Sequence, residues 1–364
     1  MAIYLTLSTI TAFFALAFSS KNQKIKKNNN ALFNILLFVL LAVLIFVQAY
    51  RSINVGGDLH DSYYLLYQIV GKVDWGRARF LFSGYEIGYL ALNKVVYGIS
   101  GGSITALLFV ISFIYLLSLY HFIKKVSPNR FFSFFLVLAF GIFNTSMNNL
   151  RSTVALSFVL LSLCFYLDKK WIRAFLLVAL GVLFHKTVVV FILFYLLALI
   201  RSKTLFTLIC LGLVLFFTIG FDTFAVIVTT IWPRYAVYFI LPSNGGGFGL
   251  MALLFLIAFA IFFVTKKSFW KVRTNVLFYK MLFFAIVLQF MSFRIGFFSR
   301  TVFYFLYSVV VLVPLVFNEF KNRNLKTVAY IVTILGMTAF FIYILVADST
   351  STVPYELING GNLL

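Results

Sequence analysis

Long apolar runs separated by short polar stretches dominate the chain. The run from Ala31 to Tyr50 carries no charge for 20 residues. At about 1.5 Å per residue, a helix of that length spans the roughly 30 Å hydrocarbon layer of a bilayer. Such runs recur to the end of the chain and predict twelve transmembrane helices, near residues 3–20, 31–50, 103–123, 131–147, 152–167, 172–184, 187–200, 204–220, 248–265, 276–293, 301–317 and 327–347. The pattern therefore predicts an all-α, polytopic integral membrane protein, with residues 1–364 forming a single transmembrane domain.

Composition supports this prediction. Of the 364 residues, 63% are hydrophobic and only 11% are charged, which is more apolar surface than a soluble core can hide. The net charge of +21 could suggest nucleic-acid binding, but no soluble stretch is long enough to present a basic face. We therefore expect no nucleic-acid partner, and membrane topology explains the charge better.

The basic residues fix the predicted orientation. The first apolar run is followed by a cluster of four lysines, Lys21, Lys24, Lys26 and Lys27. Placing this cluster in the cytoplasm puts both termini outside and collects 19 of the 30 Lys and Arg residues in inner loops. Short cytoplasmic loops of membrane proteins carry such an excess. Seven of the nine acidic residues then fall outside, so we expect any chemistry on the outer face.

Two outer segments, residues 51–102 and 221–247, are longer than simple turns. In the first, four polar or aromatic residues fall on one face of a helix, which suits a short helix in the outer interface. These residues are Glu86, Tyr89, Asn93 and Tyr97. The second segment has the Pro and Gly content of a loop or hinge. Only Pro314 interrupts a predicted span.

Three outer cations, Arg151, Lys186 and Arg300, each precede a span that runs inward, so each is expected at a helix amino terminus. Unpaired N–H groups and the helix dipole make such an end an anion site, and three together suggest a phosphate or diphosphate. Three more arginines on this face can add donors: Arg51, Arg234 and Arg294. The alternative is that these side chains anchor helices to lipid headgroups.

Arg151 has the most specific surroundings. Asn144, Asn148 and Arg151 are spaced by four and three residues, which places them on one helical face. An Asn in the stretch Asn148–Asn149 can also cap the helix that follows. The pattern indicates a polar site around Arg151.

The acidic and histidine candidates leave alternatives open. Asp58, His60 and Asp61 can bind a divalent metal, supply a general base or pair with nearby arginines. Metal binding is the weaker interpretation, because no further carboxylate or His is held near them by sequence. His185 is either a structural residue or a functional one in the outer polar layer. The signatures of phosphate loops, dinucleotide sites, zinc proteases and serine hydrolases are missing from the sequence, so we expect no cofactor.

The order of these features resembles the EpsG-like and Wzy-like family of bacterial polysaccharide polymerases. The pieces that carry the resemblance are Arg51 to Tyr64 (RSINVGGDLHDSYY), Glu86 to Tyr89 (EIGY), Asn149 to Ala155 (NLRSTVA), His185 to Thr187 (HKT), and Arg300 to Tyr304 (RTVFY). The resemblance implies a GT-C-like, multispanning glycosyltransferase in the bacterial inner membrane with its active site facing the periplasm. It would join undecaprenyl-diphosphate-linked repeat units into O-antigen, capsule or exopolysaccharide, with membrane lipids and a chain-length regulator protein as candidate partners.

The resemblance also implies roles for single residues. The acceptor would be deprotonated or oriented by one of Asp58, Glu86 and His185. The diphosphates would be held by cations in place of a metal, namely Arg51, Arg151, Lys186, Arg234, Arg294 and Arg300. Substrate-binding positions would be Asp61, Tyr64, Asn149 and Tyr304. The alternatives are an O-antigen ligase, which uses the same donor lipid, and a lipid-linked oligosaccharide flippase or transporter, which the scarcity of broken spans disfavours.

Overall fold

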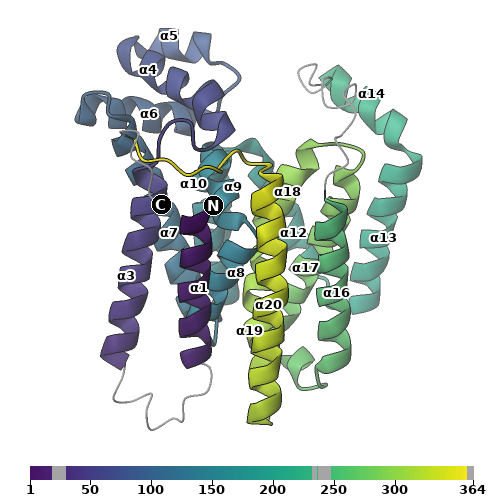
Figure 1. The fold of residues 1–364 in the computed structure, drawn as a ribbon. Coiled ribbons are helices and arrows are strands. Elements are labelled where there is room, and N and C mark those ends of the chain that lie inside the picture. The colour runs from purple at the N-terminus through teal and green to yellow at the C-terminus, as the bar shows by residue number, and fades with distance from the viewer. Residues whose placement is uncertain (19–29, 232–235, 237–246, 359–364) are drawn as a thin grey trace. The chain divides into compact units, whose positions relative to one another are not determined.

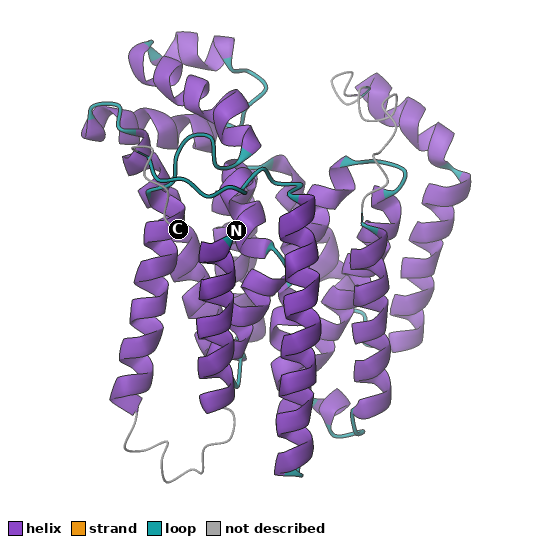
Figure 2. Cartoon of the chain, in the orientation of Figure 1, coloured by secondary structure: helices purple, strands orange, loops and turns teal. Residues whose placement is uncertain are grey.

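The structure is a computed structural model that describes residues 1–18, 30–231, 236 and 247–358. In these residues every named element is a helix, and a single isolated β-bridge joins Arg51 to Leu357 (Figures 1 and 2). Six of the described helices are long and apolar enough to cross a membrane, and two bent helix pairs raise the number to eight. The chain is thus an all-helical, polytopic membrane protein, as predicted.

The described residues divide into two compact units, Met1–Val189 with Phe320–Leu364, and Val190–Glu319. The helices of the first unit are α1 (Ala2–Ala17), α3 (Asn30–Ala49), η1 (Leu59–Tyr63), α4 (Tyr64–Lys72), α5 (Trp75–Leu81), α6 (Ile87–Ser100), α7 (Ile104–Val126), α8 (Arg130–Ala139), α9 (Ile142–Asn148), α10 (Leu150–Leu167), α11 (Trp171–Val182), η2 (Lys186–Val189) and α20 (Arg323–Ala347). Those of the second are α12 (Val190–Ala198), α13 (Lys203–Ile219), α14 (Phe221–Ile231), α16 (Phe248–Val264), η4 (Phe269–Lys271), α17 (Arg273–Ser292), α18 (Phe297–Phe305) and α19 (Tyr307–Asn318). The single domain predicted from sequence stays a prediction.

Each of the twelve predicted spans overlaps a helix. Four of the spans coincide with shorter apolar segments of 10–17 residues, namely α1, α11, η2 with α12, and α16. One other predicted span, 131–147, is broken, because α8 and α9 meet at a bend of 59°. The predicted span 204–220 coincides with α13 and ends where the chain bends by 82° into α14. The prediction that only Pro314 interrupts a span is therefore wrong.

Glycines mark both breaks. Gly141, between α8 and α9, has a φ of 65°, a left-handed conformation that other residues adopt at a cost. Gly220 lies at the second break, and residues 221–231 form α14 rather than the predicted loop. Apolar residues recur every three to four positions in residues 221–231, which is the pattern of a short helix.

In the first unit, α10 packs on α7 and α11, α3 packs on α7, and α1 packs on α8 and α20. The helices α4, α5 and α6 form a layer beyond one end of α3 and α7 (Figure 1). This layer is seated by an apolar cluster that joins Tyr63, Tyr67 and Tyr89 to Leu107 of α7 and Val154 of α10. The aromatic rings above α10 are therefore fixed by buried packing.

Polar contacts gather at the same end of the first unit. Residues 348–358, called here the closing segment, cross from α20 to the chain that follows α3. Ser52 N–H donates to the Glu356 carbonyl at 2.8 Å, and Gly56 N–H donates to the Ser351 carbonyl at 2.7 Å. At the other end, Asn129 Nδ2 donates to the Ala15 carbonyl and Lys125 pairs with Asp168. The unit thus has a polar end, which carries α4 to α6 and the closing segment, and an opposite end rich in Lys and Arg.

In the second unit, α17 is the central helix and contacts α12, α13, α16, α18 and α19. Stacked aromatic rings join these helices, for example Phe191 with Phe305 at a centroid distance of 4.5 Å. In a bilayer every backbone polar group must be satisfied inside the protein, which explains why the apolar runs are helical throughout.

Candidate active site

Glu86 is brought to the site by a close approach between two backbones. It is the N-cap residue of α6, and Gly88 N–H donates to the Leu183 carbonyl at 2.8 Å, just after α11. A Cβ atom on Gly88 would lie 2.7 Å from the Leu183 carbonyl oxygen, which is closer than real Cβ contacts. Glycine at position 88 therefore permits the contact that sets Glu86 beside the turn between α11 and η2.

The Glu86 carboxylate is buried and fully engaged. One oxygen, Oε2, accepts a hydrogen bond from Nη1 of Arg151 at 2.8 Å. The other, Oε1, accepts from the Lys186 backbone N–H at 3.1 Å and lies 3.4 Å from Nδ1 of His185. Burial raises the pKa of this carboxyl, but the contact with His185, the charge of Arg151 and the Lys186 N–H together lower it to about 2. Glu86 is therefore an anion that positions its neighbours.

Arg151 lies in the first turn of α10, as predicted, with its guanidinium held among tyrosines. The guanidinium carbon is 4.5 Å from the centroid of the Tyr85 ring and 5.9 Å from that of Tyr63, distances at which a cation is attracted to a ring face. Nε also donates to the Tyr63 hydroxyl at 3.4 Å. Within the described residues no acceptor meets Nη2, and the side chain is 18% exposed. A charged donor edge thus stays available to an anion.

His185 completes the cluster. Its ring is mostly buried, and Nδ1 lies 3.4 Å from Oε1 of Glu86 without forming a hydrogen bond. With its proton on Nδ1, the ring would be held by the carboxylate and would present an unprotonated Nε2. Hydrogen bonds at catalytic groups are often long before substrate binds. The arrangement can orient His185 as a base next to the Arg151 guanidinium.

Four residues that belong to separate groups of predicted site residues come together in the structure. Glu86 and His185 were candidates for acceptor deprotonation or orientation, and Arg151 and Lys186 for diphosphate binding. Lys186 contributes its backbone N–H to Glu86, while its side chain is exposed. It begins η2, in line with the predicted helix start.

Two tyrosines of the cluster, Tyr63 and Tyr85, were missed. Of the two tyrosines in the first motif, Tyr64 was the predicted substrate contact, but Tyr64 packs against the apolar cluster while Tyr63 contacts Arg151. The five-residue π turn η1 ends at Tyr63 and shifts the helical phase there. The only signal in the sequence was the position of Tyr85 directly before Glu86.

Arg51 lies elsewhere at the polar end and is fully buried. Its guanidinium donates to the carbonyls of Gln48, Val55 and Met147, the last at 2.7 Å. Burial lowers the pKa of Arg51 to about 10. Its donors are directed at backbone carbonyls that end α3 and α9, so the geometry describes a structural contact, and its predicted role at a diphosphate stays untested.

The carboxylates of the first motif are near this segment. Asp58 is half-buried, and its backbone N–H donates to Oδ1 of Asn148 at 2.8 Å. Asp61 is exposed and contacts His60, with Oδ1 at 3.0 Å from Nδ1. Across the part of the chain that the structure describes, no three His, Cys, Asp or Glu side chains come together as metal ligands.

The asparagines around Arg151 have separate partners. Asn144 Nδ2 donates to Oγ1 of Thr352 in the closing segment at 2.9 Å, and Asn148 contacts Asp58. Asn149 occupies the N-cap position of α10, but its side chain makes no capping hydrogen bond. The break between α9 and α10 separates these side chains, so the predicted single polar face does not form.

The remaining candidates belong to the second unit or lie outside the described residues. Arg300 is the exposed fourth residue of α18, and Tyr304 of the same helix is fully buried. Arg294 is exposed, with its guanidinium 5.5 Å from the centroid of the Phe221 ring. Arg234 lies outside the described residues.

A comparison with known proteins identifies the family. The model of the EpsG family matches residues 34–357, a stretch that includes all the residues of the cluster around Glu86. No curated protein and no solved structure matches the chain. Because the match covers most of the chain, it is decisive for membership, and it suggests a polysaccharide polymerase. The chain belongs to the EpsG family.

Proposed function

We propose that this protein joins undecaprenyl-diphosphate-linked oligosaccharide repeat units into a surface polysaccharide at the outer face of the bacterial inner membrane. The observation that carries the proposal is the cluster of Glu86, Arg151 and His185. It sets a cation with an available donor edge beside an imidazole that faces a buried carboxylate. These are the groups that a transfer from a diphosphate leaving group needs.

The reaction would be a displacement at the anomeric carbon of the donor glycan. A hydroxyl of the acceptor repeat unit attacks this carbon, a new C–O bond forms, and the bond to the diphosphate oxygen breaks. Undecaprenyl diphosphate leaves with the bonding electrons, and the proton of the hydroxyl passes to Nε2 of His185. Arg151 neutralises the charge that develops on the leaving diphosphate.

Glu86 acts as a positioning residue in this scheme. A carboxyl group with a pKa of about 2 is too weak a base to remove a hydroxyl proton at neutral pH, and both of its oxygens already accept hydrogen bonds. It holds Arg151 and His185 in place. Lys186, Arg234, Arg294 and Arg300 are proposed as further diphosphate ligands, Asp58 as an acceptor-orienting group, and Asp61, Tyr64, Asn149 and Tyr304 as substrate contacts.

The charge distribution supports the outer location. In the first unit the cluster lies at the polar end, whereas exposed basic residues such as Lys124, Lys170 and Arg173 lie at the opposite end. Basic loops favour the cytoplasm. The proposal therefore includes twelve spans in a GT-C-like arrangement, with the four short helices and two bent pairs crossing the bilayer.

The test is polymer formation by purified protein supplied with a lipid-linked repeat unit. We expect a ladder of products on a gel that is lost in Arg151→Ala and in His185→Ala and retained in Arg77→Ala, which removes an exposed arginine of α5. Removing one charged contact to a transition state costs about 2 to 4 kcal/mol, or roughly 30- to 1000-fold in rate. Wild-type ladders from both site variants would refute the proposed roles.

The same assay distinguishes the polymerase from a ligase and from a transporter. A ligase would move the glycan to a different acceptor and would form no ladder from repeat units alone. A transporter would move the lipid-linked unit across vesicles without extending it. Because we propose cations in place of a metal, excess chelator should leave the ladder unchanged, and activity that returns only with magnesium or manganese would contradict this part of the mechanism.

A further inference from the structure

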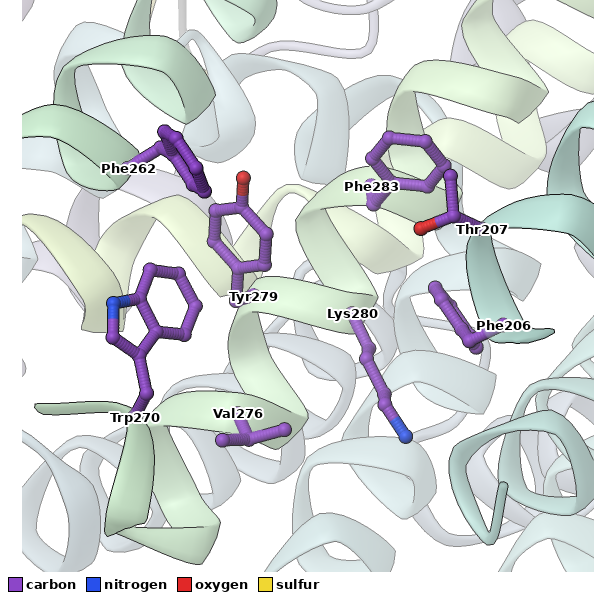
Figure 3. Close-up of a pocket in the computed structure, with 8 residues that line it drawn as sticks. All are labelled: Phe206, Thr207, Phe262, Trp270, Val276, Tyr279, Lys280 and Phe283. Carbon is purple, nitrogen blue, oxygen red and sulfur yellow. The ribbon is translucent and has the colours of Figure 1, made fainter. Parts of the chain in front are cut away.

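A groove in the second unit is lined by none of the candidate catalytic residues. Helix α17 packs against both α13 and α16, and the groove opens between these two neighbours above the first turns of α17. Its volume is about 340 Å³. The lining side chains come from α13, α16, η4 and α17 and are Phe206, Thr207, Phe262, Trp270, Val276, Tyr279, Lys280 and Phe283 (Figure 3).

The lining is almost entirely apolar and aromatic. Trp270 and Tyr279 meet edge to face with ring centroids 4.7 Å apart, and Phe262 at the border of the groove is 60% exposed. Lys280 directs its ammonium group to the carbonyls of Ala198 and Ile200, where it caps the end of α12. Its stem lines the groove while its charge is bound by backbone. The groove therefore suits a hydrocarbon chain better than a sugar.

Three exposed lysines, called here the basic rim, lie within four residues of Trp270, which lines the groove. Lys266, Lys267 and Lys271 are exposed and belong to the connection between α16 and α17, on either side of Trp270. No acidic residue occurs between positions 265 and 275. Trp and Tyr rings near lysines are typical of the level where lipid headgroups meet the hydrocarbon layer.

We propose that this groove binds an anionic glycerophospholipid. One acyl chain lies against Phe206, Tyr279 and Phe283, and the phosphate group contacts the rim of Lys266, Lys267 and Lys271. Charge complementarity selects this occupant, because a zwitterionic lipid fills the groove equally well but gains less from three exposed cations. The site is independent of the proposed glycosyltransfer, since no residue of the cluster around Glu86 takes part.

The test compares lipids with the same acyl chains. Protein in detergent is titrated with phosphatidylglycerol or phosphatidylcholine, and bound lipid is counted by native mass spectrometry. Wild type should retain phosphatidylglycerol preferentially. The triple variant Lys266→Gln, Lys267→Gln, Lys271→Gln should lose this preference. Each removed charge should lower the affinity for phosphatidylglycerol about fivefold.

The matched control is Lys124→Gln, Lys170→Gln, Arg173→Gln, which removes three exposed charges from the first unit. It should bind both lipids as wild type does. A second variant, Val276→Phe, narrows the groove and should weaken both lipids alike. The proposal is overturned if the rim variant keeps the wild-type preference, if the control loses it equally, or if Val276→Phe binds both lipids unchanged. Equal elution of all variants from a sizing column establishes that they fold.

Discussion

Replacing Glu86 with Gln should remove much of the acid sensitivity of the first unit. The pKa of Glu86 is about 2 in the folded protein, against an ordinary value of 4.5. A group whose pKa is depressed by folding contributes stability that is complete above its unfolded pKa and is lost as pH falls through the folded value. The loss for this carboxyl therefore begins at about pH 5 and is complete only at about pH 1, below both pKa values.

The magnitude follows from the pKa difference. Each pKa unit corresponds to about 1.36 kcal/mol, so the full contribution is about 3 kcal/mol, and we reduce it to about 2 kcal/mol because water reaches part of the cluster. Only part of this is lost by pH 3, about 1 kcal/mol or a little more. For a unit of some 200 residues, this corresponds to a fall in Tm of roughly 2 to 4 °C.

The assay is thermal unfolding in detergent at pH 6 and pH 3 for wild type and Glu86→Gln. Because Gln cannot titrate, the variant should start with a lower Tm at pH 6 and lose fewer degrees on acidification. Asp74→Asn is the control, since Asp74 also has a lowered pKa, through its hydrogen bond from the Arg77 N–H, but is exposed and outside the cluster. An unchanged difference between pH 6 and pH 3 in Glu86→Gln would refute the assignment of a depressed pKa.

Three more predictions address the packing of the same region. The single variants Glu86→Gln and Arg151→Gln should each destabilise the protein by about 2 to 3 kcal/mol, and the double variant by clearly less than their sum, because each single change leaves one buried partner unpaired; additive Tm losses would show that the pair is not coupled. Arg51→Met should cost about 3 kcal/mol or more and reduce the yield of folded protein on a sizing column, since three carbonyls lose their donor; normal yield with lost activity would instead indicate a direct role in the reaction. Gly88→Ala should lower both Tm and polymer yield, as its Cβ meets the Leu183 carbonyl, while Gly98→Ala, which meets nothing within 4 Å, should affect neither.

The fold class followed from the sequence because hydrocarbon admits few backbone structures. A run such as residues 31–50 has no stable alternative to a helix in lipid, and α3 forms there as predicted. The bend at Gly141 was not predicted, because a glycine within an apolar run is compatible with a straight helix as well as with a bend. The end of a span at Gly220 was predicted, but the helix α14 that follows it was not.

The site could be predicted only by residue type. Glu86, Arg151 and His185 were recognised as polar residues on the predicted outer side of the membrane. Their contacts with one another depend on how α6 packs against the turn after α11, which no local sequence pattern encodes. Arg51 shows the converse. An arginine beside an apolar run has the same sequence signal whether it faces a ligand or, as here, is buried against carbonyls.

The closing segment has a consequence for biosynthesis. The Gly56 N–H donates to the Ser351 carbonyl, so two segments of the chain that are about 300 residues apart must meet before the polar end is complete. At a synthesis rate of about 5 to 20 residues per second, the later segment is synthesised some 15 to 60 s after the earlier one. During that interval the backbone N–H groups of Ser52 and Gly56 and the side-chain amide of Asn144 lack the acceptors that the closing segment later supplies. The nascent first unit is thus an incomplete intermediate throughout insertion of the second, and membrane chaperones or proteases that monitor unpaired polar groups would encounter it in that state.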